Sequence, residues 1–285
     1  MQNYFAQKIL LFLLIILMSL FVQADTKQSL LAKYKVIGDG MQKISLTSSL
    51  TEISGIAFTE DGRLFAHNDE VAIMYEVDKQ TGKIVKWFNV GEYVLTDDFE
   101  DIAIFGPNFY IVTSKGDLFR FYEQPDKGYS QYRKFSTGLT RKHDVEGLCY
   151  DPVTHSLLLA CKGSDEKKSG YKNVYTFDLN SKTLLQEPRF RLNISEVTKL
   201  TGIKDFSPSG IERNSVSGSF FIISANDKAI IEISAEGKLL AQSKLKNEIH
   251  KQPEGITFGK DLFMYISDEG GKSSATLTKY PFTRK

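Results

Sequence analysis

A fivefold repeat constrains this 285-residue chain more than any other feature of its sequence. Each copy is a short apolar segment, a tight turn and a second apolar segment that ends in polar residues. The copies begin with "TEISGIAF", "DDFEDIAI", "HDVEGLCY", "FSPSGIER" and "QPEGITF". Aligned on positions 55, 101, 147, 210 and 255, they recur at intervals of 46, 46, 63 and 45 residues. Short strands with a period in the forties are typical of the blades of a β-propeller.

The segments after each repeat complete the predicted blades. A third strand-like segment follows, such as "AIMYEVD", and most copies add a fourth, such as "KIVKWFNV". "ISEVTKL", at residues 194–200, is the one candidate for a short helix or turn. The predicted fold class is therefore all-β, a five-bladed propeller. Six blades are the alternative, if residues 29–47 form a degenerate blade.

The fifth copy ends after three strands, which would leave an outer strand edge unpaired. An exposed edge is a site for unwanted strand pairing. The N-terminal segment "LLAKYKVIGDGMQKISL", residues 30–46, has strand character and no blade of its own. We predict that it supplies the missing outer strand and closes the ring.

The N-terminus predicts export from the cell. Lys8 precedes an apolar run from Ile9 to Val22, and "VQA" ends at Ala24, as in a secretory signal peptide. The run is shorter than the roughly 20 residues that span a bilayer. We expect residues 1–24 to be removed and residues 25–285 to form one propeller domain in the periplasm or outside the cell. An uncleaved inner-membrane anchor is the alternative, and would be the only membrane contact.

The charge balance limits the expected partners. Without Lys8 the chain holds 35 basic and 35 acidic side chains, so its formal charge is near zero. A nucleic-acid partner would require a basic excess or stripe. We expect a monomer that binds a small molecule or a protein at the channel mouth or rim, and no nucleic acid.

The two cysteines are predicted to be free. In a hairpin of residues 145–151 and 156–162, Cys149 falls opposite Leu158. Cys161 is then displaced by about 10 Å along the strand. A disulfide requires Cα atoms within roughly 7 Å.

The five ordered motifs "ISGIAF", "FEDIAI", "VEGLCYD", "PSGIE" and "PEGITF" resemble the SdiA-regulated or YjiK-like family of exported bacterial propellers. The resemblance extends over essentially all of residues 25–285. It implies a propeller of the NHL and lactonase type in the cell envelope, and it implies no established reaction.

Strand pairing predicts where the residue before each aligned position lies. It places Ser54 opposite Asn68, Glu100 opposite Ser114, Glu146 opposite Cys161, Ser209 opposite Ser224, and Glu254 opposite Ile266 and Ser267. If the first strand of each blade lines the central channel, these five residues converge on one channel mouth. The predicted ligand-binding residues at this mouth are Ser54, His67, Asn68, Asp69, Ser114, Lys115, Lys162, Ser209, Ser224, Asn226, Ser267, Asp268 and Glu269.

Glu100, Glu146 and Glu254 are the predicted metal ligands. Carboxylates brought together repel one another and need a cation, a shared proton or basic neighbours. Calcium, which takes six to eight oxygen ligands, would suit them. Salt bridges from Lys115 and Lys162 are an alternative. The glutamates could also serve only the blade structure, by accepting hydrogen bonds from backbone amides.

Two function classes stay open. The first is a non-enzymatic binding module, and the second is a metal-dependent hydrolase, lactonase-like or phosphoesterase-like, that uses the same carboxylates. The sequence favours the first, because His67 or a spare carboxylate is the only candidate general base. The sequence holds no Gly-x-Ser-x-Gly elbow and no phosphate-binding loop. His143 is expected at the rim, and His155 and His250 in solvent.

Overall fold

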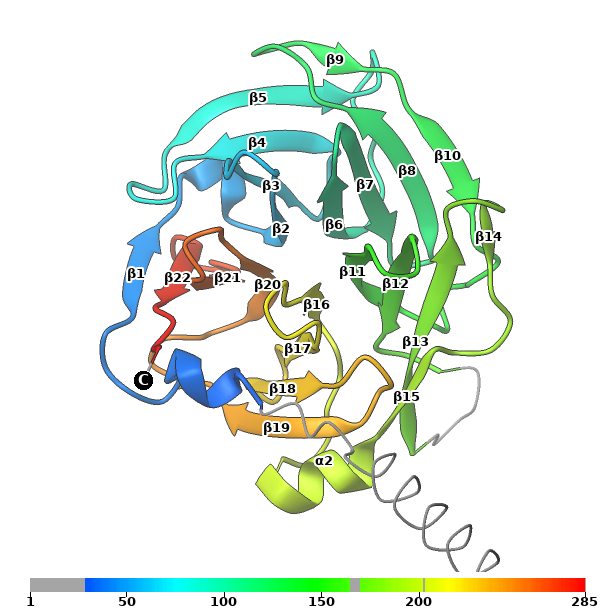
Figure 1. The fold of residues 1–285 in the computed structure, drawn as a ribbon. Coiled ribbons are helices and arrows are strands. Elements are labelled where there is room, and N and C mark those ends of the chain that lie inside the picture. Colours follow the sequence, from blue (N-terminus) through cyan, green and yellow to red (C-terminus); the bar gives the residue numbers. More distant parts are fainter. Residues whose placement is uncertain (1–28, 165–169, 202, 285) are drawn as a thin grey trace, which may run out of the picture.

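Five β-sheets surround one central axis in the computed structural model, which describes residues 29–164, 170–201 and 203–284 (Figure 1). The strands nearest the axis are β2 (Ile53–Phe58), β6 (Phe99–Phe105), β11 (Val145–Asp151), β16 (Gly210–Arg213) and β20 (Pro253–Phe258). Each begins with one of the five repeated motifs. The prediction of an all-β propeller with five blades is confirmed, and residues 29–47 do not form a sixth.

The sheets are numbered as blades along the chain. Blade 1 adds β3 (Leu64–Asn68), β4 (Ile73–Val77), β5 (Ile84–Val90) and β9 (Tyr129–Ser130) to β2. Blade 2 adds β7 (Asn108–Thr113), β8 (Asp117–Tyr122) and β10 (Arg133–Ser136) to β6. Blade 3 adds β12 (Ser156–Cys161), β13 (Tyr171–Asp178), β14 (Thr183–Leu184) and β15 (Phe190–Asn193) to β11. Blade 4 adds β17 (Phe220–Ser224), β18 (Ala229–Ile233) and β19 (Leu239–Lys244) to β16. Blade 5 adds β21 (Met264–Asp268), β22 (Thr276–Tyr280) and β1 (Gln42–Ser45) to β20.

The few helices lie outside the sheets. They are η1 (Leu31–Tyr34), η2 (Ser48–Leu50) and α2 (Ile194–Thr201). The last of these covers "ISEVTKL", so the prediction of a short helix there is confirmed. Within the described residues, none of the helices has the length and apolar character that crossing a membrane requires.

The ring is closed by the N-terminal strand, as predicted. β1 pairs antiparallel with β22, from Gln42 opposite Lys279 to Ser45 opposite Thr276. In Figure 1 the blue strand lies beside the red one. The buried carboxylate of Glu232 holds the residues before η1, because its Oε2 accepts hydrogen bonds from Ser29 Oγ at 2.6 Å and Leu30 N at 2.8 Å. The predicted signal peptide, residues 1–24, lies outside the described residues.

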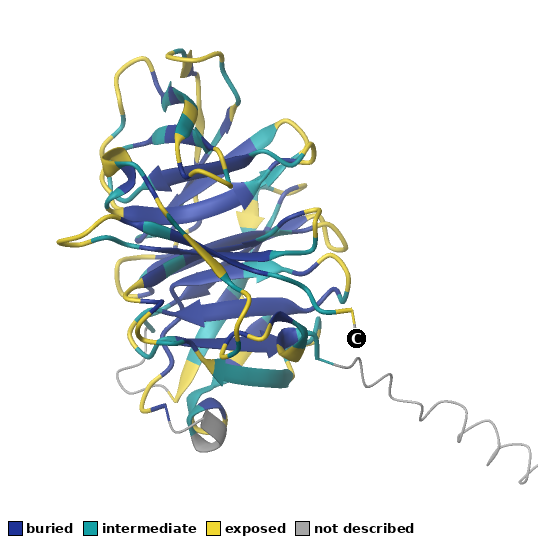
Figure 2. Cartoon of the chain, turned by 90° about the vertical axis from the view of Figure 1, so that its left-hand side faces the viewer, coloured by how far each residue is buried: buried dark blue, intermediate teal, exposed yellow. Residues whose placement is uncertain are grey.

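The core lies between the blades, where facing sheets pack through apolar side chains. Every residue of β12 is buried, which explains its unbroken apolar run. Between blades 1 and 2, the Phe65 and Phe109 rings meet edge to face with centroids 5.1 Å apart. Figure 2 shows buried positions along the strands and exposed ones in the connections. Cys149 lies opposite Leu158, and Cys149 and Cys161 form no disulfide, as predicted. Both side chains are buried.

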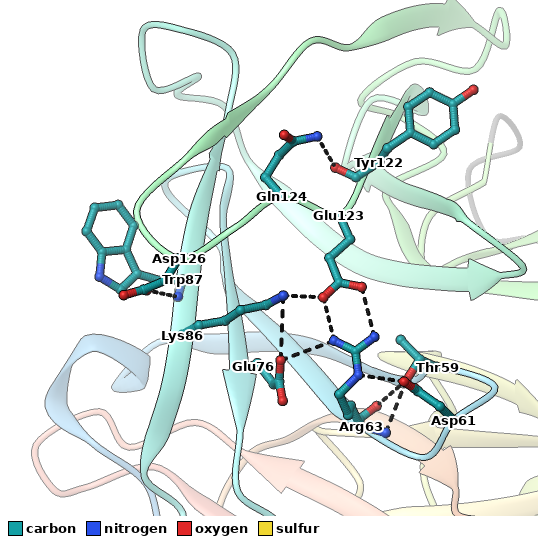
Figure 3. Close-up of polar contacts among 10 residues, drawn as sticks. All are labelled: Thr59, Asp61, Arg63, Glu76, Lys86, Trp87, Tyr122, Glu123, Gln124 and Asp126. Atoms are coloured by element: carbon teal, nitrogen blue, oxygen red, sulfur yellow. Dashed lines mark hydrogen bonds and ion pairs between the residues drawn. The ribbon is translucent and has the colours of Figure 1, made fainter.

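A charge network joins blades 1 and 2 at the end of the ring where the inner strands finish (Figure 3). Glu123, which follows β8, accepts hydrogen bonds from both Arg63 and Lys86 of blade 1. Arg63 also pairs with Glu76 at 3.2 Å. The chain then runs on into β9, which pairs with β5 before the chain returns to blade 2 as β10.

Candidate functional site

The three predicted glutamates lie in β-bulges at the start of the inner strands. Pairing passes from Val145 opposite Cys161 to Gly147 opposite Ala160, so Glu146 has no partner residue. The same irregularity lies at Glu100 and at Glu254. A bulge inserts one extra residue and redirects a side chain, often beside a functional site.

The bulges correct the predicted pairings. Asn68 lies opposite Ile53 and not Ser54, and Cys161 lies opposite Val145 and not Glu146. Likewise Phe99 pairs with Thr113, Pro253 with Asp268, and Gly255 with Ser267. The prediction paired residues one for one outward from each turn, and this count misses an inserted residue. Glu100 therefore does not lie opposite Ser114, and Glu254 lies opposite neither Ile266 nor Ser267. Ser209 lies just before β16 and donates its N–H to Ile223 O at 2.9 Å.

The three glutamates nevertheless converge at one mouth of the channel. Burial, and then repulsion from Glu146, Asp98 and Glu254, raises the pKa of Glu100 to about 10. Burial, and then repulsion from Glu146, raises the pKa of Glu254 to about 9. Neither the Glu100 nor the Glu254 carboxyl group accepts a hydrogen bond from the described residues. The mouth therefore holds two desolvated acids that form no ion pair with the described residues, although Lys162 partly lowers the pKa of Glu254.

Two lysines neutralise part of this acidity. Lys162 Nζ lies 2.8 Å from Glu146 Oε1, and the Glu146 side chain is buried. Lys115 Nζ lies 2.7 Å from Asp97 Oδ2 and pairs with none of the three glutamates. The salt bridge that the sequence offered as an alternative to a metal is thus present at Glu146.

As arranged, the mouth does not form a metal site. Among the described residues, no three His, Cys, Asp or Glu side chains stand close enough together to hold an ion. Calcium binding by Glu100, Glu146 and Glu254 stays a prediction. It would require Lys162 to release Glu146 and the carboxylates to move together.

The two serines at the mouth bind the neighbouring blade. Ser54 Oγ donates to Glu100 O at 2.7 Å, and Ser209 Oγ donates to Pro253 O at 2.6 Å. In each case the blade that carries Ser-Gly precedes a blade with a glutamate at its bulge. The serine hydroxyl therefore donates its hydrogen bond to the bulged strand of the next blade. This gives the alternation of serine and glutamate a structural reason.

Three more of the predicted serines make local hydrogen bonds. Ser114 Oγ donates to the Asp98 carboxylate. Ser224 Oγ accepts from Ser207 N at 3.3 Å, and Ser267 Oγ accepts from Gly255 N at 3.0 Å. The hydroxyl groups of these three serines stabilise the blades, while the carboxyl groups of Glu100, Glu146 and Glu254 face the channel mouth.

His67 is buried completely beside the mouth. Its Nδ1 lies 2.8 Å from Asn68 O, and burial lowers its pKa to about 4, so the ring is neutral at physiological pH. Its Nε2 has no hydrogen-bond partner among the described residues. Asn68 Oδ1 accepts from Val71 N at 3.1 Å, which fixes the turn after β3.

The remaining predicted residues divide between the rim and the core. Burial, and then the nearby Glu52, raises the pKa of Asp69, while burial, and then Asp69, raises that of Glu269. These two carboxyl groups extend the acidic mouth outward. Asn226 is exposed in the turn between β17 and β18. Asp268 is buried and belongs to a different network.

That network corrects the prediction for His250, which is buried and not solvated. Its Nδ1 lies 2.8 Å from Asp268 Oδ2 and its Nε2 lies 2.6 Å from Tyr280 Oη. The surrounding segment "LKNEIHKQ" reads as a polar linker, yet Leu245 and Ile249 are both buried. Their spacing of four was the available signal that this segment packs on the blades. His155 is exposed, as predicted, and His143 is buried.

Asp101 occupies the position that is glycine in the other four blades. Its Oδ1 accepts from Ile102 N at 2.8 Å, and its Oδ2 accepts from Leu148 N of blade 3 at 2.7 Å. A Cβ added at Gly55 would lie 2.6 Å from Asp101 Oδ1. The glycines therefore allow the inner strands to approach closely, and Asp101 joins two of them.

The sequence prediction missed the opposite end of the channel. Glu212 and Arg213 line a cavity there. A signal was present, because the residue two places after the aligned position is Ala57, Ala103, Cys149 and Thr257 in the other blades. Glutamate is the one charged residue in this series.

Solved propellers share the fold. The chain is similar to glutaminyl cyclase from Myxococcus xanthus, with a TM-score of 0.56 and 13% identity over 84% of this chain and 93% of that one. It is also similar to a luciferin-regenerating enzyme, with a TM-score of 0.52 and 12% identity over 85% of this chain and 95% of that one. A glucose dehydrogenase gives a TM-score of 0.52 and 12% identity over 85% and 99% of the two chains. At these identities the likeness shows the fold alone.

Comparison by sequence identifies the family. A search of curated proteins found no match to this chain. The model of the SdiA-regulated family, in contrast, matches residues 27–271, which is most of the sequence and includes all five inner strands. The chain belongs to the SdiA-regulated family of β-propellers.

Proposed function

We propose that this chain is an exported, non-enzymatic binding propeller whose acidic mouth binds a positively charged group on a small molecule or a protein. The observation that carries the proposal is the pair of unpartnered carboxyl groups of Glu100 and Glu254 at the bulges. A location in the periplasm or outside the cell is part of the proposal, and it is supported by the apolar run of residues 9–22.

The electrostatics of the mouth favour a cation. Glu100 and Glu254 are protonated at neutral pH in the free protein, because their ionised forms are desolvated and repel Glu146. A cation between them would stabilise both carboxylates and displace their protons. Binding should therefore release protons at neutral pH, and affinity should increase as the pH rises toward 9.

The two sides of the mouth are unlike, and hydrogen bonds hold the backbone that carries its acidic residues. Lys162 occupies one side by pairing with Glu146, so the carboxyl groups that a bound cation would ionise are those of Glu100 and Glu254. The bulged backbone that carries these residues is held by the serine hydroxyls of the preceding blades. Preorganised acceptors lose little conformational entropy when a ligand binds.

Thermal melts of the purified protein test the proposal. The probes are calcium chloride and 1,4-diaminobutane, with chelator as the reference for calcium. The variants are Glu100→Gln at the mouth and Glu187→Gln as a matched control, because the Glu187 side chain is 86% exposed. A hundredfold excess of ligand over its Kd should stabilise the native state by about 2.7 kcal/mol.

A shift in the natural chain and in Glu187→Gln, lost in Glu100→Gln, supports the acidic mouth as a cation site. Which probe gives the shift distinguishes calcium from an organic cation. Equal melting of all samples with and without both probes would contradict the proposal. Hydrolysis of a lactone or phosphoester that Glu100→Gln abolishes would show that the chain is an enzyme and not a binding module alone.

A further inference from the structure

A second cavity lies at the other end of the channel, where the inner strands finish. It has a volume of about 150 Å³. All five blades contribute to it, through the ends of their first strands. Its walls include three aromatic rings, those of Phe58, Tyr150 and Phe258. The acidic mouth described above shares none of its lining residues.

The aromatic walls are fixed from behind by other rings. Phe58 meets Tyr265 with centroids 5.0 Å apart and planes at 68°, and Phe258 meets Phe221 at 5.0 Å and 72°. Tyr150 stacks on Phe105 at 3.9 Å. Rings held in this way form a preformed apolar surface, which a small ligand can cover without ordering the protein.

Two adjacent residues of opposite charge complete the cavity. Glu212 Oε1 accepts a hydrogen bond from the backbone N–H of Arg213 at 2.8 Å, and its Oε2 accepts none from the described residues. Burial raises the pKa of Glu212 to about 8 although the neighbouring Arg213 lowers it, so a further cation, such as the ammonium group of a ligand, is needed to ionise Glu212 at neutral pH. The cavity thus offers one carboxylate oxygen that is free to accept a hydrogen bond.

Among the described residues, only the Nε atom of the Arg213 guanidinium contacts an acidic side chain. Its Nε lies 3.3 Å from Oδ1 of the buried Asp151, whose Oδ2 lies 3.1 Å from Arg189. The two terminal nitrogens of Arg213 make no hydrogen bond to the described residues. A guanidinium fixed at Nε presents its terminal N–H groups to a carboxylate in a geometry that favours two parallel hydrogen bonds.

We propose that this cavity binds a small zwitterion with an apolar body, namely an α-amino acid such as phenylalanine or leucine. The ligand's ammonium group binds Glu212, its carboxylate binds Arg213, and its side chain packs on Phe58, Tyr150 and Phe258. A simple amine leaves the terminal nitrogens of Arg213 without a partner, and a simple carboxylate leaves Oε2 of Glu212 without one. The cavity therefore distinguishes the zwitterion from either half, because a desolvated charge without a partner is costly.

Isothermal titration with three matched probes tests this assignment. L-phenylalanine carries both charges, 2-phenylethylamine the ammonium group alone, and 3-phenylpropionate the carboxylate alone. We expect phenylalanine to bind the purified protein at least about tenfold more tightly than either of the others, as hydrogen bonds to charged groups are worth this much. Equal binding of phenylalanine and one of the half-probes, or binding of none of the three, would overturn the proposal.

Variants locate the binding. Glu212→Gln should weaken phenylalanine binding about tenfold, while Glu187→Gln, in an exposed turn, should leave it unchanged. Phenylalanine binding that Glu212→Gln does not alter would place the ligand elsewhere. If Glu212→Gln does not fold, the comparison of the three probes on the natural chain still decides the outcome. Failure of the cation site at the acidic mouth would not change any of these results.

Discussion

At the scale of single residues, the buried acids at the channel mouth should make stability depend on pH. Glu100 titrates near its ordinary value in the unfolded chain and at about 10 in the folded one. The folded state therefore keeps a proton that the unfolded state releases, so the free energy of unfolding should fall as the pH rises from about 5 to 9.

Glu100→Gln removes the contribution of Glu100 to this dependence and leaves that of Glu254. We expect the variant to unfold with a free energy higher by on the order of 1 kcal/mol at pH 8, since one pKa unit is worth about 1.4 kcal/mol and channel solvent reduces the effect. Urea unfolding at pH 5 and pH 8 measures it. Glu187→Gln is the control, and a pH slope in Glu100→Gln equal to that of the natural chain would contradict the assignment.

The buried His250 network gives a second prediction for a single residue. Tyr280→Phe removes the hydroxyl group that lies 2.6 Å from His250 Nε2 and leaves a buried nitrogen without a partner. We expect a loss of about 1 to 3 kcal/mol of stability. Tyr265→Phe is the matched control, because the Tyr265 hydroxyl bonds to the half-exposed Asp261 and water can replace it. Equal losses of stability in both variants would show that the hydrogen bond from Tyr280 to His250 contributes no more than the one from Tyr265 to Asp261.

At the scale of elements, the inner strands need glycine where they meet. A Cβ at Gly255 would lie 2.5 Å from Ser267 Oγ and 2.9 Å from the backbone oxygen of Ser54 in the neighbouring blade. The strands cannot separate without opening the ring, so the substitution forces strain into two blades. The glycine of the repeat thus allows contact between blades, while the glutamate that precedes it at positions 146 and 254 faces the channel mouth.

Gly255→Ala should therefore destabilise the protein by about 1 to 3 kcal/mol, the usual cost of overpacking. Gly170→Ala is the control, because an added Cβ there meets no atom of the described residues within 4 Å. Thermal melts of the two variants make the comparison. A melting temperature for Gly255→Ala equal to that of Gly170→Ala would show that the inner strands can shift apart at little cost.

At the scale of the whole molecule, stability depends on closing the ring with the N-terminal segment. This segment pairs β1 with β22 and satisfies the buried Glu232 carboxylate. Glu232 Oε1 also accepts from Ser219 Oγ at 2.7 Å, so the clasp is joined to blade 4 as well as blade 5. The two ends of the chain are therefore both part of the closure.

Deletion of residues 25–48 should lower the free energy of unfolding by at least about 3 kcal/mol, since it leaves Glu232 without its N-terminal donors and β22 without its outer neighbour β1. The exposed edge of β22 should also promote association. Denaturant unfolding and size-exclusion chromatography measure the two effects. A truncated chain that stays monomeric and unfolds like the full chain would contradict this account of closure.

The sequence by itself determined the five repeats, the inner position of each repeat and the closing strand, and it left six blades only as an alternative. These follow from local patterns, because strands buried on both faces must be apolar and a period in the forties fits one blade. The convergence of Glu100, Glu146 and Glu254 followed too, since repeated segments take equivalent places in a ring.

The tertiary structure alone decided how those residues are used. The bulges that redirect the glutamates add one residue to a strand without altering its apolar pattern, so a count along the sequence misses them. The partners of His250 and of Lys162 lie on other strands, and the serine hydroxyls bind adjacent blades, which no local pattern specifies. The cavity of Glu212 and Arg213 exists only where five strand ends meet, because each strand supplies one or two of its walls.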